Sequence, residues 1–344
     1  NRDEDYQTPS ILYICGGNAC NNSYVQELIE WRRKQGYIVT VATTLSNDAD
    51  GLNNDSESAI DNYISSQYNS ANPPEIVGLI GDVNGSYDIA CDFYQWGSGY
   101  WSSYYGASDV KYTYIQGNDL LPEIVIGRIS AESGGDLANI INKTLQYEKG
   151  NYQQESYYER AALIGDPTVG SGISPAITCQ QIKELMLHHG VENVFADLNG
   201  GGAALENFLV DNFNAGSLYY NFRGIQNSPG CYITNSISNS MVSTYNNPFA
   251  VILTCATGDF QDDAFSEDFI RIGSAANPKG AVAAIGMSTT ATHTAYNNII
   301  DMGIFDGIFS KNLTHGGSAT TNGRIAMYET YPANPGDIVG AFTT

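Results

Sequence analysis

Short apolar runs alternate with amphipathic segments along most of the chain. The runs predict strands near residues 11–14, 37–42, 76–80, 124–126, 161–164, 194–196, 218–221, 251–254 and 281–285. Helical periodicity between the runs predicts helices near 24–35, 56–70, 134–148, 175–189, 203–213, 266–272 and 295–309. This alternation is typical of an α/β protein in which helices cover the faces of a mostly parallel sheet.

Two of the predicted helices carry their own start and stop signals. Ser133 followed by Asp136 resembles a capping box, and Gly150 is suited to end that helix. Ser174 before Pro175 predicts an N-cap followed by proline in the first turn. Both helices therefore have boundaries that the local sequence specifies.

A polar, tyrosine-rich segment, 151–158, separates the fourth predicted strand from the fifth. Segments of this kind are common at domain boundaries. We therefore expect an N-terminal α/β subdomain over residues 1–150 and a C-terminal α/β subdomain over residues 151–344.

The alternation fails between residues 82 and 117, which are rich in glycine, serine, tyrosine and tryptophan. Loops of this length are usually functional or are supported by an ion. Asp82, Asp119 and Glu123 lie in or just after this segment, and carboxylate oxygens are suitable ligands for Ca²⁺. The segment predicts either a structural calcium site with these ligands or a solvated acidic loop.

The composition narrows the classes of partner and compartment. The chain has 37 acidic and 15 basic residues, a net charge of -22, which disfavours binding to nucleic acid. No apolar stretch is long enough for a membrane span, and the first residues lack a signal-peptide core, so we expect a mature or trimmed segment. Only 15% of the residues are charged, a balance more typical of secreted bacterial proteins. Cys15 and Cys20 are close enough to pair in an oxidising compartment.

Cys255 is the strongest candidate for chemistry in the chain. It follows the apolar run 249–254 and precedes the Gly258-Asp259 turn, which places it at the carboxyl end of a buried strand. Ligands of open α/β sheets bind beside those ends, so the thiol could meet a substrate there. The alternative is a cysteine packed as a small apolar residue beneath the turn.

Three segments resemble the gingipain-type cysteine peptidases of peptidase family C25. They are 117–128 with 145–148, Thr254-Cys255 with 258–260, and 316–327 near the C-terminal end. The resemblance implies a caspase-like α/β fold of two side-by-side, mostly parallel sheets flanked by helices. It also implies secretion or a bacterial cell-surface location, calcium ions, and hydrolysis of peptide bonds in protein or peptide substrates.

The resemblance also assigns roles to individual residues. Cys255 corresponds to the nucleophile, and its backbone N–H would form an oxyanion hole together with that of Gly224. Asp166 corresponds to the carboxylate that orients the catalytic histidine. The family has a histidine directly after the residue that matches Gly224, and this chain has Ile225 there.

The replaced histidine leaves two functions open. His293, in a loop that resembles the wall of the family's specificity pocket, is the candidate for a relocated base in an atypical or impaired endopeptidase. The alternative is an inactive pseudo-peptidase that serves as a binding or structural module. A dinucleotide-binding enzyme is excluded because no G-x-G-x-x-G follows a strand. The resemblance further implies C-terminal domains beyond this chain.

Overall fold

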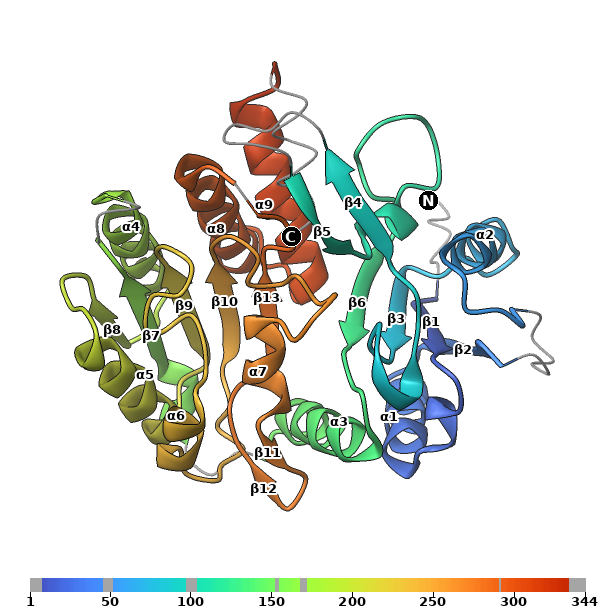
Figure 1. Ribbon diagram of the computed structural model, residues 1–344, viewed down its shortest axis with the longest axis horizontal. Helices are drawn as coiled ribbons and strands as arrows, with labels where there is room; N and C mark the ends of the chain where they lie inside the picture. Colours follow the sequence, from blue (N-terminus) through green and yellow to red (C-terminus); the bar gives the residue numbers. More distant parts are fainter. Residues whose placement is uncertain are drawn as a thin grey trace, which may run out of the picture. The chain divides into compact units, whose positions relative to one another are not determined.

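Figure 1 shows a computed structural model of the chain, which describes residues 8–45, 52–96, 104–151, 155–167, 172–290 and 292–333. The chain forms two compact units. One consists of Asn1–Asp92 and Asp109–Ile141, and the other of Phe93–Ser108 and Asn142–Thr344. The limits 1–150 and 151–344 that we expect from composition stay a prediction.

The first unit is built on a four-stranded parallel sheet with the order β2-β1-β3-β6. Its strands are β1 (Ser10–Cys15), β2 (Ile38–Thr43), β3 (Ile76–Ile80) and β6 (Val125–Ile129). Every residue of β1 is buried, as expected for a central strand with both faces covered. Leu12 and Ile14 of β1 share a core with Ile60 and Ile64 of α2 (Glu57–Tyr68).

The second unit is built on a five-stranded parallel sheet with the order β13-β10-β9-β7-β8. Its strands are β7 (Arg160–Gly165), β8 (Asn193–Asp197), β9 (Tyr219–Arg223), β10 (Phe249–Leu253) and β13 (Ala283–Gly286). The predicted α/β class, with mostly parallel sheets flanked by helices, is confirmed.

The two faces of the second sheet differ in character. One face packs against α5 (Ala203–Ala215), α6 (Asn235–Ser240) and α7 (Phe265–Arg271), in an apolar core that includes Tyr220 and Phe222. The other face meets α4 (Ser174–His188) and α8 (Thr294–Phe309) (Figure 1). Asn221 and Arg223 alternate with the aromatic residues of β9 and bond to α8, so this face contains buried polar groups.

Of the two predicted caps, one is confirmed and one is wrong. In α3 (Gly134–Glu148), the Ser133 N–H donates to Asp136 Oδ2 at 3.0 Å, and the Asp136 N–H donates to Ser133 Oγ at 3.2 Å. Helix α4 starts one residue earlier than predicted, with Ile173 at the N-cap, because proline is tolerated at either of the first two helical positions.

Several elements lack a strong local signal and were not predicted. Two are helices, α6 and α9 (Gly316–Thr330), and four are the strands of two pairs, β4 (Asp92–Trp96) with β5 (Tyr104–Ser108) and β11 (Gly273–Ser274) with β12 (Asn277–Pro278). The others are short 3-10 helices: η1 (Ala19–Asn21), which precedes α1, η2 (Gly85–Tyr87), η3 (Val110–Thr113) and η4 (Glu155–Glu159). The predicted helix α1 spans Ser23–Lys34. Helix α9 packs closely on α8, where a Cβ added to Gly303 would lie 2.7 Å from the Gly323 Cα. Its glycines permit that approach while weakening the helical pattern in the sequence.

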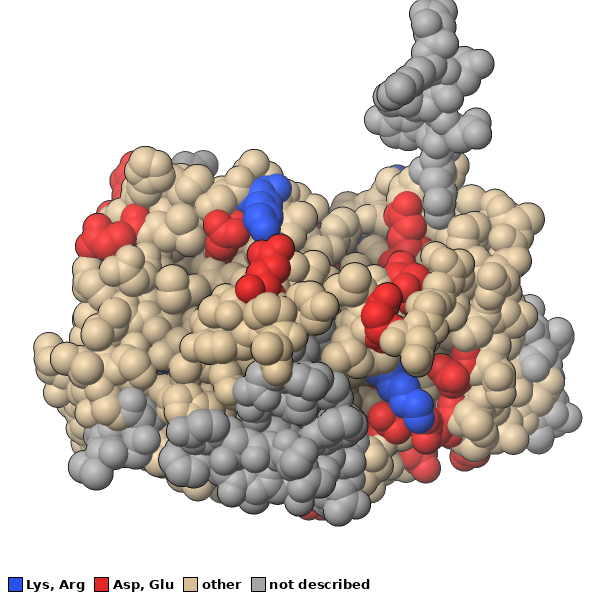
Figure 2. Space-filling view, turned by 90° about the horizontal axis from the view of Figure 1, so that it is seen from above, with Lys and Arg blue, Asp and Glu red and all other residues tan. Residues whose placement is uncertain are grey.

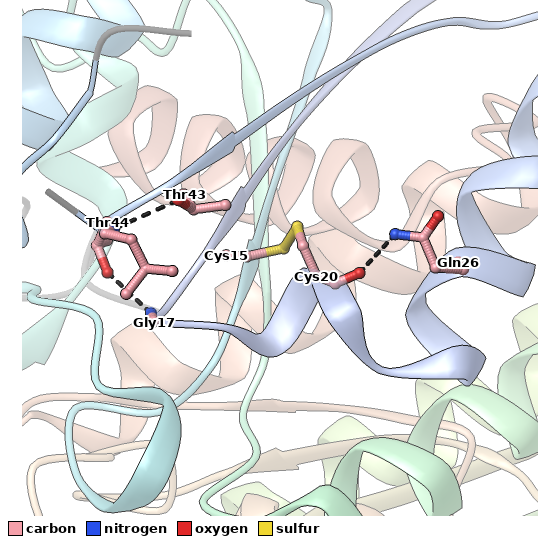
Figure 3. Close-up of a disulfide and its surroundings, with 7 residues drawn as sticks. Cys15, Gly17, Cys20, Gln26, Thr43 and Thr44 are labelled. Carbon is pink, nitrogen blue, oxygen red and sulfur yellow. Dashed lines mark hydrogen bonds between the residues drawn. A yellow bond between two sulfur atoms is a disulfide. The ribbon is translucent and has the colours of Figure 1, made fainter. Parts of the chain in front are cut away.

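A disulfide joins Cys15, the last residue of β1, to Cys20 in η1 (Figure 3). The Gln26 side chain donates to the Cys20 carbonyl at 2.5 Å, and the Gly17 N–H donates to Thr44 Oγ1 at 2.8 Å. The expected pairing is therefore present, and its surrounding hydrogen bonds fix the connection between β1 and α1.

Candidate active site

Cys255 lies two residues beyond the carboxyl end of β10, between β9 and β13 in the sheet order. The next residue, Ala256, has φ of 52°, a left-handed conformation that is uncommon for alanine. The Ala256 N–H donates to the Thr289 carbonyl at 3.0 Å, which holds this conformation. The chain therefore turns sharply at Cys255, as its sequence predicts.

Buried hydrogen bonds fix the rest of this turn. The Thr257 hydroxyl donates to the Ile252 carbonyl at 2.5 Å and lies 3.0 Å from the Thr254 carbonyl. The same oxygen accepts the Met287 N–H at 3.2 Å. A Cβ on Gly258 would lie 2.7 Å from the Gly286 backbone, so only glycine fits where the turn crosses the end of β13. The turn is thus a rigid support for the thiol.

The Cys255 thiol is partly exposed and faces Thr292. Its Sγ lies 3.8 Å from the Thr292 carbonyl oxygen and 3.6 Å from Thr292 Oγ1. Cys179 and Cys231 are buried by contrast, and burial raises the pKa of the Cys231 thiol to about 12. Of these three thiols, Cys255 is the one that solvent reaches, so the alternative of a sealed cysteine does not apply to it.

Gly224 lies at the end of the strand next to β10, and Asp166 lies at the end of the following strand, beside Gly224. Each directly follows its strand, β7 or β9, and the Asp166 N–H donates to the Arg223 carbonyl at 2.8 Å. A Cβ on Gly224 would lie 2.8 Å from the Asp166 Cβ and 2.8 Å from the Phe222 ring, so this position also requires glycine. Within the described residues, no acceptor is found for the backbone N–H groups of Gly224 and Cys255. These are the two groups that the resemblance assigns to an oxyanion hole.

His293 directly follows the threonine that contacts the thiol, and it caps α8. Its Nδ1 accepts the Ala295 N–H at 3.0 Å, and its ring packs on Tyr296 at 5.6 Å between centroids. A nitrogen that accepts a hydrogen bond carries no proton, so the neutral ring holds its proton on Nε2. Nδ1 can accept a proton only when the capping bond opens.

The other histidines lie on other elements. His188 is the last residue of α4, and His189 follows it. His315 precedes α9, with Nδ1 3.4 Å from Thr314 Oγ1. Ile225, which the resemblance matches to the family's histidine, is 40% exposed.

The three candidate calcium ligands of the first unit are each bonded to protein donors. Asp82 Oδ1 accepts from the Val83 N–H and the Ser130 hydroxyl, and Glu123 Oε2 accepts from the N–H groups of Ile115 and Gln116. Asp119 Oδ1 accepts the Leu121 N–H at 2.9 Å. No three His, Cys, Asp or Glu side chains gather as a metal site in the part of the chain that is described. The calcium site stays a prediction.

The structure adds three residues that the motifs did not identify. Thr292 contacts the Cys255 sulfur, Arg223 donates to the Leu253 carbonyl just before the Cys255 turn, and Asn298 accepts from Arg223. Only Arg223 has a signal in the sequence, because a charged residue at the end of an apolar strand is unusual.

Figure 2 shows acidic side chains spread over one face of the molecule, with the few basic ones beside them. This distribution agrees with the net charge of -22 and offers no basic footprint on that face. Among the helices that are described, none is both long enough and apolar enough to cross a bilayer.

Residues 4–340 match the sequence model of peptidase family C25. The chain belongs to peptidase family C25. Its relatives include gingipain R2 of Porphyromonas gingivalis, which is 27% identical over 239 residues, covering 65% of this chain and 32% of the relative. Lys-gingipain of the same species is 25% identical over 294 residues, covering 82% of this chain and 16% of the relative. The chain thus spans about a third or less of the length of these relatives.

Solved structures give the same fold. The crystal structure of the Arg-specific cysteine proteinase gingipain R has a TM-score of 0.78 and 21% identity, over 99% of this chain and 77% of that one. A second structure, titled "Structure of Protease", has a TM-score of 0.79 and 20% identity, over 94% of this chain and 73% of that one. The resemblance to gingipain-type peptidases and the caspase-like α/β fold are therefore confirmed.

Proposed function

We propose that this C25 domain is a cysteine endopeptidase that hydrolyses peptide bonds through Cys255. The observation that carries the proposal is the partly exposed thiol on a rigid turn at the carboxyl end of β10, with Gly224 at the end of the adjacent strand and Asp166 one strand further. Membership of a peptidase family makes proteins or peptides the expected substrates.

The chemistry assigned to this site is acyl transfer. The thiolate attacks the carbonyl carbon of the substrate, and the developing oxyanion accepts hydrogen bonds from the N–H groups of Cys255 and Gly224. The amine then leaves with a proton, and water hydrolyses the thioester to release the acid and restore the thiol. Each step needs a group that removes or returns one proton.

His293 is our candidate for that proton carrier. It adjoins Thr292, whose carbonyl and hydroxyl contact the thiol. Because Nδ1 caps α8, the ring must release the Ala295 N–H before Nδ1 can take a proton. We therefore propose a base that is less available than the family's histidine, which makes slow turnover the expected behaviour.

The deciding experiment measures cleavage of an unfolded protein substrate by the chain and by its Cys255→Ala variant. Cys91→Ala is the matched control, since Cys91 is also partly exposed and not disulfide-bonded. The proposal expects cleavage that is lost in Cys255→Ala and retained in Cys91→Ala. Absence of cleavage, with Cys255 alkylated no faster than an ordinary thiol of pKa near 8.5, would instead support an inactive binding or structural module.

A second set of proposals concerns the cellular location of the protein, bound calcium ions and further C-terminal domains. We propose a secreted or surface location in a bacterium, supported by the Cys15–Cys20 disulfide and by gingipain relatives. Structural calcium and further C-terminal domains are carried over from the family resemblance. Loss of thermal stability on chelation would test the first, and sequencing the neighbouring coding region would test the second.

A further inference from the structure

Arg223 is a fully buried cation at the carboxyl end of β9. Its guanidinium donates to Asn298 Oδ1 from Nε at 2.9 Å and from one terminal nitrogen at 2.6 Å. It also donates to the main-chain carbonyls of Leu253 and Thr294, the latter at 3.3 Å. One side chain therefore links three separate segments.

Those segments are the ones that carry the candidate catalytic residues. Leu253 lies two residues before Cys255, and Thr294 directly follows His293. The backbone of Arg223 completes the set, since its carbonyl accepts the Asp166 N–H and its next residue is Gly224. Movement of Arg223 would therefore disturb the backbone next to Cys255, His293, Asp166 and Gly224.

The charge of Arg223 lacks a direct counter-ion. Among the described residues, no carboxylate lies within ion-pair distance of its guanidinium, and its acceptors are neutral. Burial lowers the pKa of Arg223, and the Asp301 carboxylate on α8 opposes that lowering. The guanidinium donates to the Leu253 carbonyl, two residues before Cys255, so a buried positive charge is fixed beside the turn that carries the thiol.

Retaining an unpaired buried cation is costly, and an apolar side chain of similar volume would avoid that cost. Asn221 Nδ2 donates to Asp301 Oδ2 at 3.0 Å, so this carboxylate oxygen bonds to Asn221 and not to Arg223. The arrangement suits a site in which negative charge forms on the nearby sulfur during reaction.

We propose that Arg223 is a positioning residue that holds the nucleophile turn and the start of α8 and supplies the fixed positive charge that favours the Cys255 thiolate. This inference rests on the proposed role of Cys255 as nucleophile. The imidazolium that the family provides beside its thiol is replaced in part by a guanidinium that cannot be deprotonated near neutral pH.

The test is the pH dependence of Cys255 alkylation by iodoacetamide, localised by mass spectrometry in the folded chain. Arg223→Met removes the charge, so we expect the midpoint of alkylation to move to higher pH by ~1 unit or more. Arg223→Lys retains the charge, so its midpoint should lie nearer to that of the wild type. Asn298→Asp has the same shape and places an anion beside the guanidinium, so it should also raise the midpoint even if Arg223→Met fails to fold.

Lys143→Met is the matched control for the loss of a long, buried, hydrogen-bonded side chain. Lys143 is also fully buried and donates to two carbonyls, those of Ile270 and Lys279, away from the thiol. A purely structural role for Arg223 predicts that folded Arg223→Met and Asn298→Asp keep the wild-type midpoint, and this result overturns the inference. The alkylation midpoint of Cys255 must stay unchanged in Lys143→Met for the test to be valid. A shifted midpoint in this variant would mean that general destabilisation alone changes the pH dependence of alkylation.

The outcome separates this inference from the proposed function. If the midpoints move as expected but no substrate is cleaved, Arg223 acts on the thiol and the peptidase proposal fails. If Cys255-dependent cleavage is present while the midpoints of Arg223→Met and Asn298→Asp do not move, the peptidase proposal stands and the inference about Arg223 fails.

Discussion

Each unit holds an arginine with a buried side chain near the carboxyl end of a parallel strand. The two guanidinium groups differ in their hydrogen-bond acceptors. Arg128 in β6 makes two bonds to the Asp109 carboxylate, at 2.8 and 2.7 Å, and donates to the carbonyls of Gly81, Ile89 and Ala90. Arg223 in β9 bonds only to neutral oxygens. The positive charge of Arg128 is therefore paired with a carboxylate inside the fold. Among the described residues, the positive charge of Arg223 has no such partner, and we propose that it acts on the Cys255 thiol.

The largest effect on stability should come from Arg128→Met. It leaves Asp109, which is 9% exposed, as a buried carboxylate without its partner, so we expect a loss of ~3–5 kcal/mol in denaturant unfolding. The midpoint of Cys255 alkylation should not change. A double variant with Asp109→Leu should recover most of the loss, and a loss smaller than that of Arg223→Met would contradict the contrast between the two arginines.

Asp301→Asn should change how stability depends on pH. Burial raises the pKa of Asp301 from its usual 3.8 to about 7, so the folded state binds the proton more tightly than the unfolded state does. The free energy of unfolding therefore falls as pH rises from about 4 to about 7 and stays low above that range. Asparagine does not ionise, so we expect a gain of ~2–4 kcal/mol at pH 8 and little change at pH 4. Equal gains at both pH values in chemical denaturation would refute this assignment.

Gly224→Ala and Gly127→Ala compare the steric fit at the end of β9 with that at the middle of β6. A Cβ on Gly224 meets Asp166 and Phe222 at 2.8 Å, whereas nothing lies within 4 Å of a Cβ on Gly127. We expect Gly224→Ala to cost ~1–3 kcal/mol and to lower kcat, with Gly127→Ala near neutral. Thermal unfolding and initial rates give the two readouts, and a larger cost for Gly127→Ala would show that contact at residue 224 is not limiting.

The smallest effect should separate the cap of His293 from its proposed proton transfer. His293→Asn can retain the cap of α8, and His293→Ala removes it at a cost of ~1 kcal/mol. If His293 is the base, both variants lose activity to the same extent while only the alanine variant loses stability. Retained activity in His293→Asn would exclude the imidazole from the reaction.

Much of the fold could be predicted from local pattern, and much less of the site could. Apolar runs such as 249–253 specify buried parallel strands, and Cys255 was placed correctly because strand ends and turns have strong local signals. Local pattern does not predict helix α9, because its glycines have low helix propensity. The same glycines allow the close contact with α8 on which the helix depends.

The contacts of Arg223 and Thr292 could not be predicted for a related reason. They join side chains to segments 30 to 71 residues away in the chain, and no periodicity reports which loop lies beside which strand end. The roles of Asp166, Gly224 and His293 came from family resemblance. Their chemistry stays a prediction, although the structure gives each one a defined place.

The short loop closed by the Cys15–Cys20 bridge has a practical consequence for enzymology. Its two cysteines are only five positions apart, so the bridge restrains a small part of the unfolded chain. A reductant strong enough to keep Cys255 as a thiol should therefore loosen the connection between β1 and α1 without unfolding the second sheet. Activity measured in dithiothreitol would then reflect the chemistry at Cys255 and not unfolding of the second unit.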